Sequence, residues 1–274
     1  MNWKILSLAA LVLAGVARAN PFFAMDTVIH NSLDDIDTVK RLGYAGIGWR
    51  VGVPEQVAAA ADQIRQHGLK LYSLFSVATL TRTNLTWSSQ LEGDIIALKG
   101  SDTVIWLKIE GKGIPKSSPD GNAVALPALQ KLADFAASNG LRVAIYPHTG
   151  CWAERVQDAV RLAKLVNRPN FGATFNLCHC LMVGDEEKIP ELLAEAAPYL
   201  FLVSINGADA GAAGTKWDQL IQPLDAGSYD VGIVLRKLKE LNYAGPIALQ
   251  GYGIKIPASE NLTRSMNGWK KLNH

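Results

Sequence analysis

The sequence predicts a (β/α)8 barrel, an α/β fold in which eight parallel strands are each followed by a helix. Short apolar runs alternate with amphipathic stretches along nearly the whole chain, and polar or glycine-containing connections separate them. Strands joined by helical crossovers pair in parallel. Eight such units usually take about 250 residues, and no linker divides this chain. We therefore expect a single barrel domain over residues 20–274.

Eight apolar runs are the candidate strands. They lie at 22–28, 44–49, 69–75, 103–109, 142–147, 171–176, 200–205 and 246–250. Helical patterns lie between and after them, at 33–42, 54–67, 88–99, 126–139, 152–167, 186–197, 230–241 and 258–270. Helix stops such as "HGL" (67–69) and "NGL" (139–141) stand directly before apolar strands. An open doubly wound sheet is the alternative, but the glycine-rich turn that usually accompanies nucleotide binding there is absent.

Residues 1–19 have the pattern of an export signal. Lys4 precedes an almost unbroken apolar run from Ile5 to Val16, and Ala17-Arg18-Ala19 is a small-x-small cleavage pattern. The run is too short to span a bilayer comfortably. We expect cleavage before Asn20 and a mature protein that is periplasmic or secreted, with no membrane segment.

The charge balance argues against a nucleic-acid partner. Removing residues 1–19 takes away two basic residues, so Lys+Arg falls from 27 to 25 against 25 Asp+Glu. A nucleic-acid binder normally has a basic surplus that neutralises phosphates. The mature chain has none.

The three cysteines do not form a disulfide framework, because an odd number cannot be fully paired. One bridge from Cys151 to Cys178 or Cys180 is possible if those loops are neighbours. A metal cluster at Cys178-His179-Cys180 is disfavoured, because adjacent positions on an extended chain point to opposite faces. Buried thiols are the favoured interpretation.

Polar side chains follow the predicted strands, at the end of the barrel where catalytic groups gather in this fold. Lys108 and Glu110 share a parity at the end of the fourth strand and therefore a face. The later strands end with Tyr146 and His148, with Asn176 and His179, with Ser204, Asn206 and Asp209, and with Gln250 and Tyr252. Polar side chains that gather at one end of apolar strands in this way mark a candidate site.

Three segments of the second half resemble the xylose isomerase-like barrels, which include sugar-phosphate isomerase/epimerase proteins. "GLRVAIYPHTG" (140–150) resembles the segment that supplies a Glu just before Pro-His. "PNFGATFNLCH" (169–179) resembles the segment that supplies Asp-x-x-His. "LDAGSYDVGIVLRKLKELNYAGPIALQ" (224–250) resembles the family's ending, which finishes in Glu. The resemblance covers most of the mature chain and implies a barrel that acts on a small carbohydrate.

In the relatives, a divalent metal is held by Glu, Asp, His and Glu from strands five to eight. The matching positions in this chain are Tyr146, Asn176, Ser204 and Gln250. Hard cations prefer anionic oxygen, and these side chains are neutral. We therefore expect no family-type divalent metal. A Zn²⁺ site built from His148, His179 and one cysteine is the remaining metal option, with little support from the spacing.

Two histidines are the candidate catalytic bases. Proton abstraction beside a carbonyl needs a base with a pKa near ambient pH and a donor to the developing oxyanion. His148 and His179 could be that base, or could be hydrogen-bonded packing residues, and Asp209 is the remaining carboxylate for proton work. The candidate substrate contacts are Tyr146, Asn176, Asn206, Gln250, Lys108 and Glu110.

Several side chains have a structural alternative. Lys108 and Glu110 could be a catalytic pair or a salt bridge that closes a strand end. Arg50 could bind a carboxylate or phosphate, or could simply be exposed. Three tryptophans could stack on sugar faces, although core packing explains most tryptophans in a barrel: Trp49, Trp106 and Trp152.

The leading functional hypothesis is an exported isomerase, epimerase or lyase that acts on a carbohydrate or keto-sugar by histidine-mediated proton transfer. Without the metal, neutral donors suffice only if the substrate has an acidic C–H. The alternative is a non-catalytic sugar-binding protein that keeps the barrel pocket. Nucleic-acid repair, which uses the same barrel, is rejected because the chain is neutral and lacks the metal-ligating carboxylates.

Overall fold

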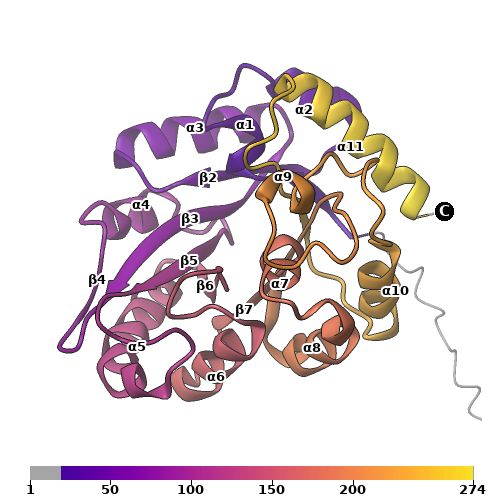
Figure 1. Cartoon of the computed structure of the whole chain (residues 1–274). Helices are drawn as coiled ribbons and strands as arrows, with labels where there is room; N and C mark the ends of the chain where they lie inside the picture. The colour runs from indigo at the N-terminus through magenta and orange to yellow at the C-terminus, as the bar shows by residue number, and fades with distance from the viewer. Residues whose placement is uncertain (1–19, 274) are drawn as a thin grey trace, which may run out of the picture.

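Eight parallel strands close on themselves in the computed structural model, which describes residues 20–273. The last strand pairs with the first, and Phe22 lies opposite Ile247. Figure 1 shows the helices as a ring outside the strands. In their order around the barrel, the strands are β1 (Phe22–Ala24), β2 (Gly46–Arg50), β3 (Lys70–Leu80), β5 (Val104–Gly111), β6 (Arg142–Ile145), β7 (Phe171–Asn176), β8 (Leu200–Ile205) and β9 (Ile247–Leu249). The predicted (β/α)8 barrel is confirmed.

Helices follow the strands as the hydrophobic patterns predict. They are α1 (Asp26–Ile29), α2 (Ile36–Leu42), α3 (Pro54–Gln66), α4 (Leu91–Ala97), α5 (Asn122–Ser138), α6 (Val156–Val166), α7 (Leu177–Met182), α8 (Ile189–Ala196), α9 (Trp217–Leu220), α10 (Gly232–Glu240) and α11 (Ala258–Leu272). Single 3-10 turns lie at Pro119–Gly121, Glu186–Lys188 and Ala197–Tyr199. The C-terminal helix α11 lies beside α2 of the N-terminal part, so both ends of the described chain meet on one side (Figure 1).

The first predicted strand is too long. It ends at Ala24, and the chain turns at Met25 into the short helix α1. Asp26 and Thr27 thereby lie at the mouth of the barrel instead of in its wall. A polar pair at the end of an apolar run is consistent with this early stop, because the barrel interior has no partners for a charge.

The third strand is longer than predicted. β3 continues to Leu80 and returns as the antiparallel strand β4 (Leu85–Trp87), which extends the wall away from the barrel (Figure 1). In the second half of β3, buried and partly exposed side chains alternate, as expected for a strand with one face against the core and the other towards solvent.

"LCHC" forms helix α7, and the prediction of an extended chain there was wrong. Residues on a helix advance by about 100° each, so Cys178, His179 and Cys180 point in three directions. His179 points towards the barrel mouth, and both cysteines are buried. The three cysteines are free thiols, and no disulfide joins them.

The barrel interior is filled by a compact cluster that forms the floor of the mouth. Trp106 is fully buried there and donates its Nε1 hydrogen to Thr174 Oγ1 at 2.8 Å. Tyr146 meets Trp106 edge to face, with ring centroids 4.9 Å apart. The buried members of this cluster are Phe23, Met25, Val104, Trp106, Ala144, Tyr146, Leu202 and Ala248. Trp106 belongs to this core, and Trp49 and Trp152 are buried in the outer core between strands and helices.

Over residues 20–273 no helix combines the length and apolar character needed to cross a membrane. The predicted signal peptide at 1–19 lies outside the described residues.

Candidate functional site

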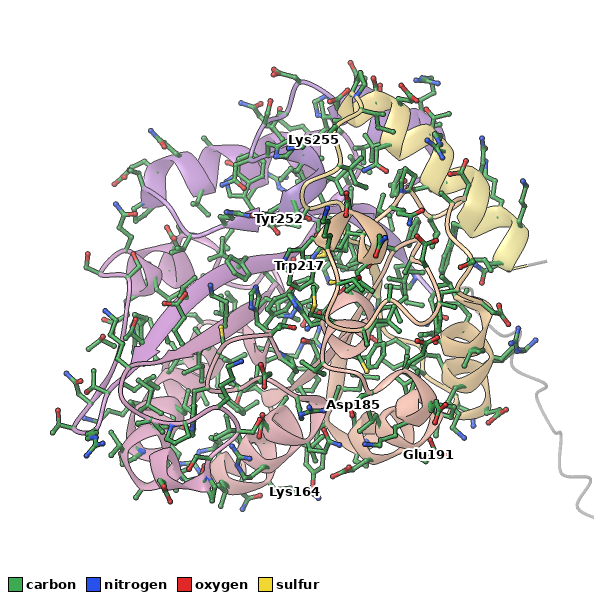
Figure 2. All side chains as sticks on the ribbon, in the orientation of Figure 1. Lys164, Asp185, Glu191, Trp217, Tyr252 and Lys255 are labelled. Carbon is green, nitrogen blue, oxygen red and sulfur yellow. The ribbon has the colours of Figure 1, made fainter. Side chains whose placement is uncertain are left out.

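A pocket of about 330 Å³ lies at the carboxyl ends of the strands, the end where active sites of such barrels form. Figure 2 shows two aromatic side chains of its rim, Trp217 of α9 and Tyr252 of the loop after β9, over the middle of the barrel. The polar and charged residues of the lining are Asp26, Thr27, Arg50, Lys108, Tyr146, His148, His179 and Gln250. The other lining residues are Met25, Phe75, Trp217, Ile221 and Tyr252.

A chain of hydrogen bonds runs through the wall of this pocket. Thr27 donates its hydroxyl to Gln250 Oε1 at 2.5 Å, and Gln250 Nε2 donates to the Tyr146 hydroxyl at 3.2 Å. Gln250 Oε1 also accepts from the backbone N–H groups of Gly251 and Tyr252, each at 2.9 Å. The orientation of the amide is thereby fixed, with its NH₂ group towards Tyr146.

The chain continues from Tyr146 to His179. The two side chains meet at 3.3 Å between the hydroxyl and Nε2. Because the tyrosine oxygen already accepts from Gln250, its own proton is free to be donated to the imidazole. Burial raises the pKa of Tyr146 well above its ordinary value. Burial, with help from His148 and Lys108, holds the pKa of His179 well below its ordinary value. Both groups are therefore neutral at pH 7.

His148 lies against His179, with ring centroids 4.0 Å apart. Its Nδ1 donates to the carbonyl of Thr149 at 2.8 Å, which leaves the proton on Nδ1 and a lone pair on Nε2. Burial lowers the pKa of His148 from 6.5, and the positive charge of Lys108 lowers it further. A neutral imidazole with a free lone pair on a pocket wall has the chemistry that a general base needs.

The ends of β1, β2 and β5 carry two pairs of acidic and basic side chains at the pocket. Asp26 is 2% exposed and is paired with Arg50 Nε, and the Arg50 guanidinium lies over the Phe75 ring. Burial raises the pKa of Asp26, although Arg50 opposes the shift. Lys108 Nζ is 2.8 Å from Glu110 Oε1, which is the predicted salt bridge at a strand end.

Four predicted site residues lie outside the pocket lining. Asn176 is buried and joins three strand ends, since its Nδ2 donates to the carbonyl of Pro147 at 3.1 Å and its Oδ1 accepts from Ser204 Oγ at 2.9 Å. Its amide thus has partners within the wall. Three more predicted site residues do not line the pocket, and their roles in binding or catalysis stay predictions: Asn206, Asp209 and Glu110.

Local contacts hold two of these side chains in the loop after β8. Asn206 donates to the carbonyls of Gly207 and Leu220, each at 2.7 Å. Asp209 accepts from Gln222 Nε2 at 2.9 Å and from the backbone N–H of Ser228 at 3.2 Å. The arrangement carries the chain over the barrel mouth to α9.

The sequence did not indicate Asp26 or Trp217 as site residues. Asp26 had a signal, because it is the one ionisable residue in the apolar run 22–28. Trp217 had none, because the four-residue helix α9 lies in a loop without periodicity. The fold places both side chains in one pocket lining with His179 and Gln250, and the Trp217 ring lies against His179.

Metal ligands do not converge in the described part of the chain. No three His, Cys, Asp or Glu side chains of residues 20–273 form a group that could hold a metal ion. Cys151 Sγ is 3.6 Å from His148 Nδ1, but that nitrogen already faces the Thr149 carbonyl. Burial raises the pKa of Cys151 to about 11, so the thiol stays protonated and is a poor ligand.

Comparisons with known proteins agree with the fold. A sequence model of the xylose isomerase-like TIM barrel family matches residues 36–272. L-ribulose 3-epimerase of Methylomonas sp. (strain DH-1) is 24% identical over 252 residues, which cover 85% of this chain and 82% of the relative. The structure of the IOLI protein with a bound zinc atom superposes with a TM-score of 0.73 at 16% identity, over 92% of this chain and 97% of the other. D-allulose 3-epimerase from Methylomonas sp., in complex with D-allulose, gives 0.69 at 18% identity, over 92% and 96%.

Proposed function

Because the chain belongs to the xylose isomerase-like TIM barrel family, we propose that it is a sugar isomerase or epimerase that moves a proton with a neutral histidine and without the family's divalent metal. The carrying observation is the hydrogen-bonded group Gln250–Tyr146–His179, with the unprotonated His148 beside it. The carbohydrate substrate is supported by the family and by the relatives, which are named as sugar epimerases.

The donor set at the ends of β6 to β9 does not fit a hard divalent cation. Tyr146 is a neutral phenol, and the oxygen of Asn176 accepts from Ser204. The oxygen of Gln250 accepts three hydrogen bonds, from Thr27, Gly251 and Tyr252. A hard cation is held mainly by anionic oxygens, and none of these side chains is anionic. The chemistry is therefore assigned to the side chains alone.

His148 is the proposed base. Its Nε2 takes a proton from the carbon next to a carbonyl, and the C–H electrons form a C=C bond while the carbonyl electrons move onto oxygen. Tyr146 and Gln250 line the pocket. The second N–H of Gln250 can donate to that oxygen, and so can the Tyr146 O–H when it turns from His179 to the substrate. When His148 returns the proton to the former carbonyl carbon and the hydroxyl of the first carbon loses its proton to become the new carbonyl, the product is an isomer. When the first carbon instead takes a solvent proton on its other face, and the proton on His148 passes to solvent, the product is an epimer. Neutral donors are sufficient for an acidic C–H, as in a keto-sugar.

Solvent deuterium exchange tests the proposal directly. Keto-sugars in D₂O, followed by proton NMR, should lose the signal of the hydrogen next to the carbonyl, and the rate should be unchanged by EDTA. His148→Gln should abolish exchange, whereas Lys70→Gln, at the opposite end of the barrel, should not. Loss of exchange with EDTA would rule out the metal-free mechanism. Sugar binding with no exchange would favour the non-catalytic sugar-binding hypothesis.

Export is part of the same proposal, and it is supported by the signal pattern of residues 1–19. A fusion of residues 1–25 to a reporter that is active only outside the cytoplasm should be active, and replacing the apolar run by charged residues should silence it. Activity of the altered fusion would contradict export.

A further inference from the structure

We propose that the pocket selects a monosaccharide that bears a single carboxylate, and that Arg50 and Lys108 bind this carboxylate. The inference rests on the proposed function for the sugar part of the ligand only. It is carried by the position of two cations on neighbouring parts of the pocket wall, on either side of Phe75 of β3.

Arg50 presents an oriented and only partly used guanidinium. Its Nε is paired with the buried Asp26, and its plane lies over the Phe75 ring, with Cζ 5.5 Å from the ring centroid. These two contacts fix the group, while the side chain stays 48% exposed. Its terminal nitrogens donate to none of the described residues. A planar fork held from one side is suited to two parallel hydrogen bonds with a carboxylate.

Lys108 supplies the second cation. Its side chain is 16% exposed and lines the pocket, whereas its partner Glu110 is 43% exposed and does not line it. An ammonium has three donors, so two stay available after the bond to Glu110. Each cation thus has its own carboxylate on one side and free donors on the other.

The carboxyl groups already present favour a monoanion. Arg50 is paired with Asp26, and Lys108 is paired with Glu110. A ligand carboxylate gains charge-assisted hydrogen bonds from the donors that these two pairs leave unused. A phosphate brings a charge of about −1.5 to −2 at pH 7 and would lie close to Asp26, which lines the same pocket.

The same geometry places the rest of the ligand for proton transfer. Lys108 lies in the second half of β5, His148 follows the adjacent strand β6, and the charge of Lys108 lowers the pKa of His148. An acid group held by Lys108 therefore places the sugar carbons next to the base. The aromatic rim of Trp217 and Tyr252 is then left for the sugar ring.

Binding without turnover tests the inference. Isothermal titration should be done with matched pairs, D-glucuronate against D-glucose and D-galacturonate against D-galactose, and with D-glucose 6-phosphate. At least one acid should bind about tenfold or more tightly than its neutral partner, which is the effect of one charge-assisted contact. Equal binding within both pairs, no binding of either acid, or tighter binding of the phosphate would overturn the inference.

Variants locate the effect. Lys108→Gln should remove most of the preference for the acid, and Arg50→Lys should weaken it by keeping the charge without the fork. Because Arg50→Gln alone leaves Asp26 unpaired, the double variant Asp26→Asn/Arg50→Gln is the folded comparison, and it should also lose the preference. Lys70→Gln is the matched control, because it removes a lysine at the other end of the barrel. An unchanged preference in the double variant contradicts the inference.

The two proposals fail separately. Acid-selective binding with no deuterium exchange on any sugar refutes the proposed function and leaves the inference standing. Deuterium exchange on neutral keto-sugars, with no preference for acids in binding, refutes the inference and leaves the proposed function standing.

Discussion

The two ends of the barrel both carry a hollow lined by charged side chains, and the hollows differ in kind. At the amino ends of the strands, a hollow of about 510 Å³ is lined by Lys70, Asp102 and Arg142. There Asp102 accepts from Lys70 at 3.0 Å and from Arg142 at 2.9 Å, and it is 57% exposed. These charges are solvated and pair with one another.

The carboxyl-end pocket is smaller, but two of its titratable groups are removed from water. Asp26 is 2% exposed and His179 is 5% exposed, and burial shifts the pKa of each towards the neutral form. Shifted pKa values in a cleft are typical of functional sites, and active sites of such barrels form at the carboxyl ends of the strands. The comparison teaches that desolvation, and not the size of the hollow, distinguishes the two ends.

The largest expected effect is loss of turnover in His148→Gln. Removing a general base costs about 10²–10⁴-fold in rate, and the deuterium exchange rate measures it. Arg142→Gln at the other hollow is the control and should leave the rate within about twofold of the parent protein. Equal losses in both variants would mean that the two ends do not differ in function.

Tyr146→Phe should have the next largest effect. The change removes one neutral donor from the pocket wall, which costs up to about 10²–10³-fold in kcat if that donor faces the oxyanion. It also leaves Gln250 Nε2 and His179 Nε2 without their partner, so a loss of about 1–3 kcal/mol in the free energy of unfolding is expected. Urea unfolding separates the two effects. A fall in stability with an unchanged rate would restrict Tyr146 to a structural role.

The pH dependence of turnover should move with Lys108. The base acts when neutral, and the pKa of His148 lies below 6.5, so the rate should stay high as the pH falls through 6.5 and drop only below it. Lys108→Gln removes a positive charge that lowers this pKa, so the midpoint of the acid limb should rise. Midpoints from rate–pH profiles of the two proteins decide the matter, and a downward shift contradicts the assignment.

The smallest effect is expected in Asp94→Asn, which tests whether desolvation alone marks function. Asp94 of α4 is fully buried, its Oδ2 accepts from the backbone N–H of Gly52, and its Oδ1 has no partner. Burial raises the pKa of Asp94 from 3.8 to about 6. Between these two values the folded state holds more protons than the unfolded state, so the free energy of unfolding falls as the pH rises through this window.

The asparagine variant lacks that penalty. Its stability relative to the parent protein should therefore improve by an amount on the order of 1 kcal/mol between about pH 4 and about pH 7. Urea unfolding at both values measures the change, and the exchange rate should be unaltered because Asp94 does not line the pocket. A loss of turnover would extend the site beyond the pocket wall.

The fold could be predicted from the sequence because each strand and helix leaves its own periodic signal. All eight barrel strands lie within or overlap the predicted runs. Four small features of the fold were not predicted, because contacts between distant segments set them. They are the turn at Met25, the β4 hairpin, and helices α7 and α9. Four residues are too few to show a helical period, so α9 and its Trp217 had no signal.

The site could be predicted in part. Position at the strand ends grouped Lys108, Tyr146, His148, His179 and Gln250, and these side chains line one pocket. Parity also put Glu110 on the face of Lys108, but Glu110 does not line that pocket. Parity does not say whether an amide faces the cavity or bridges its neighbours. Asn176 is such a bridge, since both of its polar atoms have partners on β6, β7 and β8. Asp26 was overlooked because it was assigned to the interior of a strand.

The hydrogen bonds from Thr27 to His179 have a consequence for the nascent protein. Gln250 links Thr27, 223 residues earlier in the chain, to Tyr146, 104 residues earlier. Tyr146 and His179 are therefore not held in place until the last strand has left the ribosome and paired with the first. Shorter chains have the histidines without Gln250, so the hydrogen-bonded group Gln250–Tyr146–His179 forms only when the barrel closes.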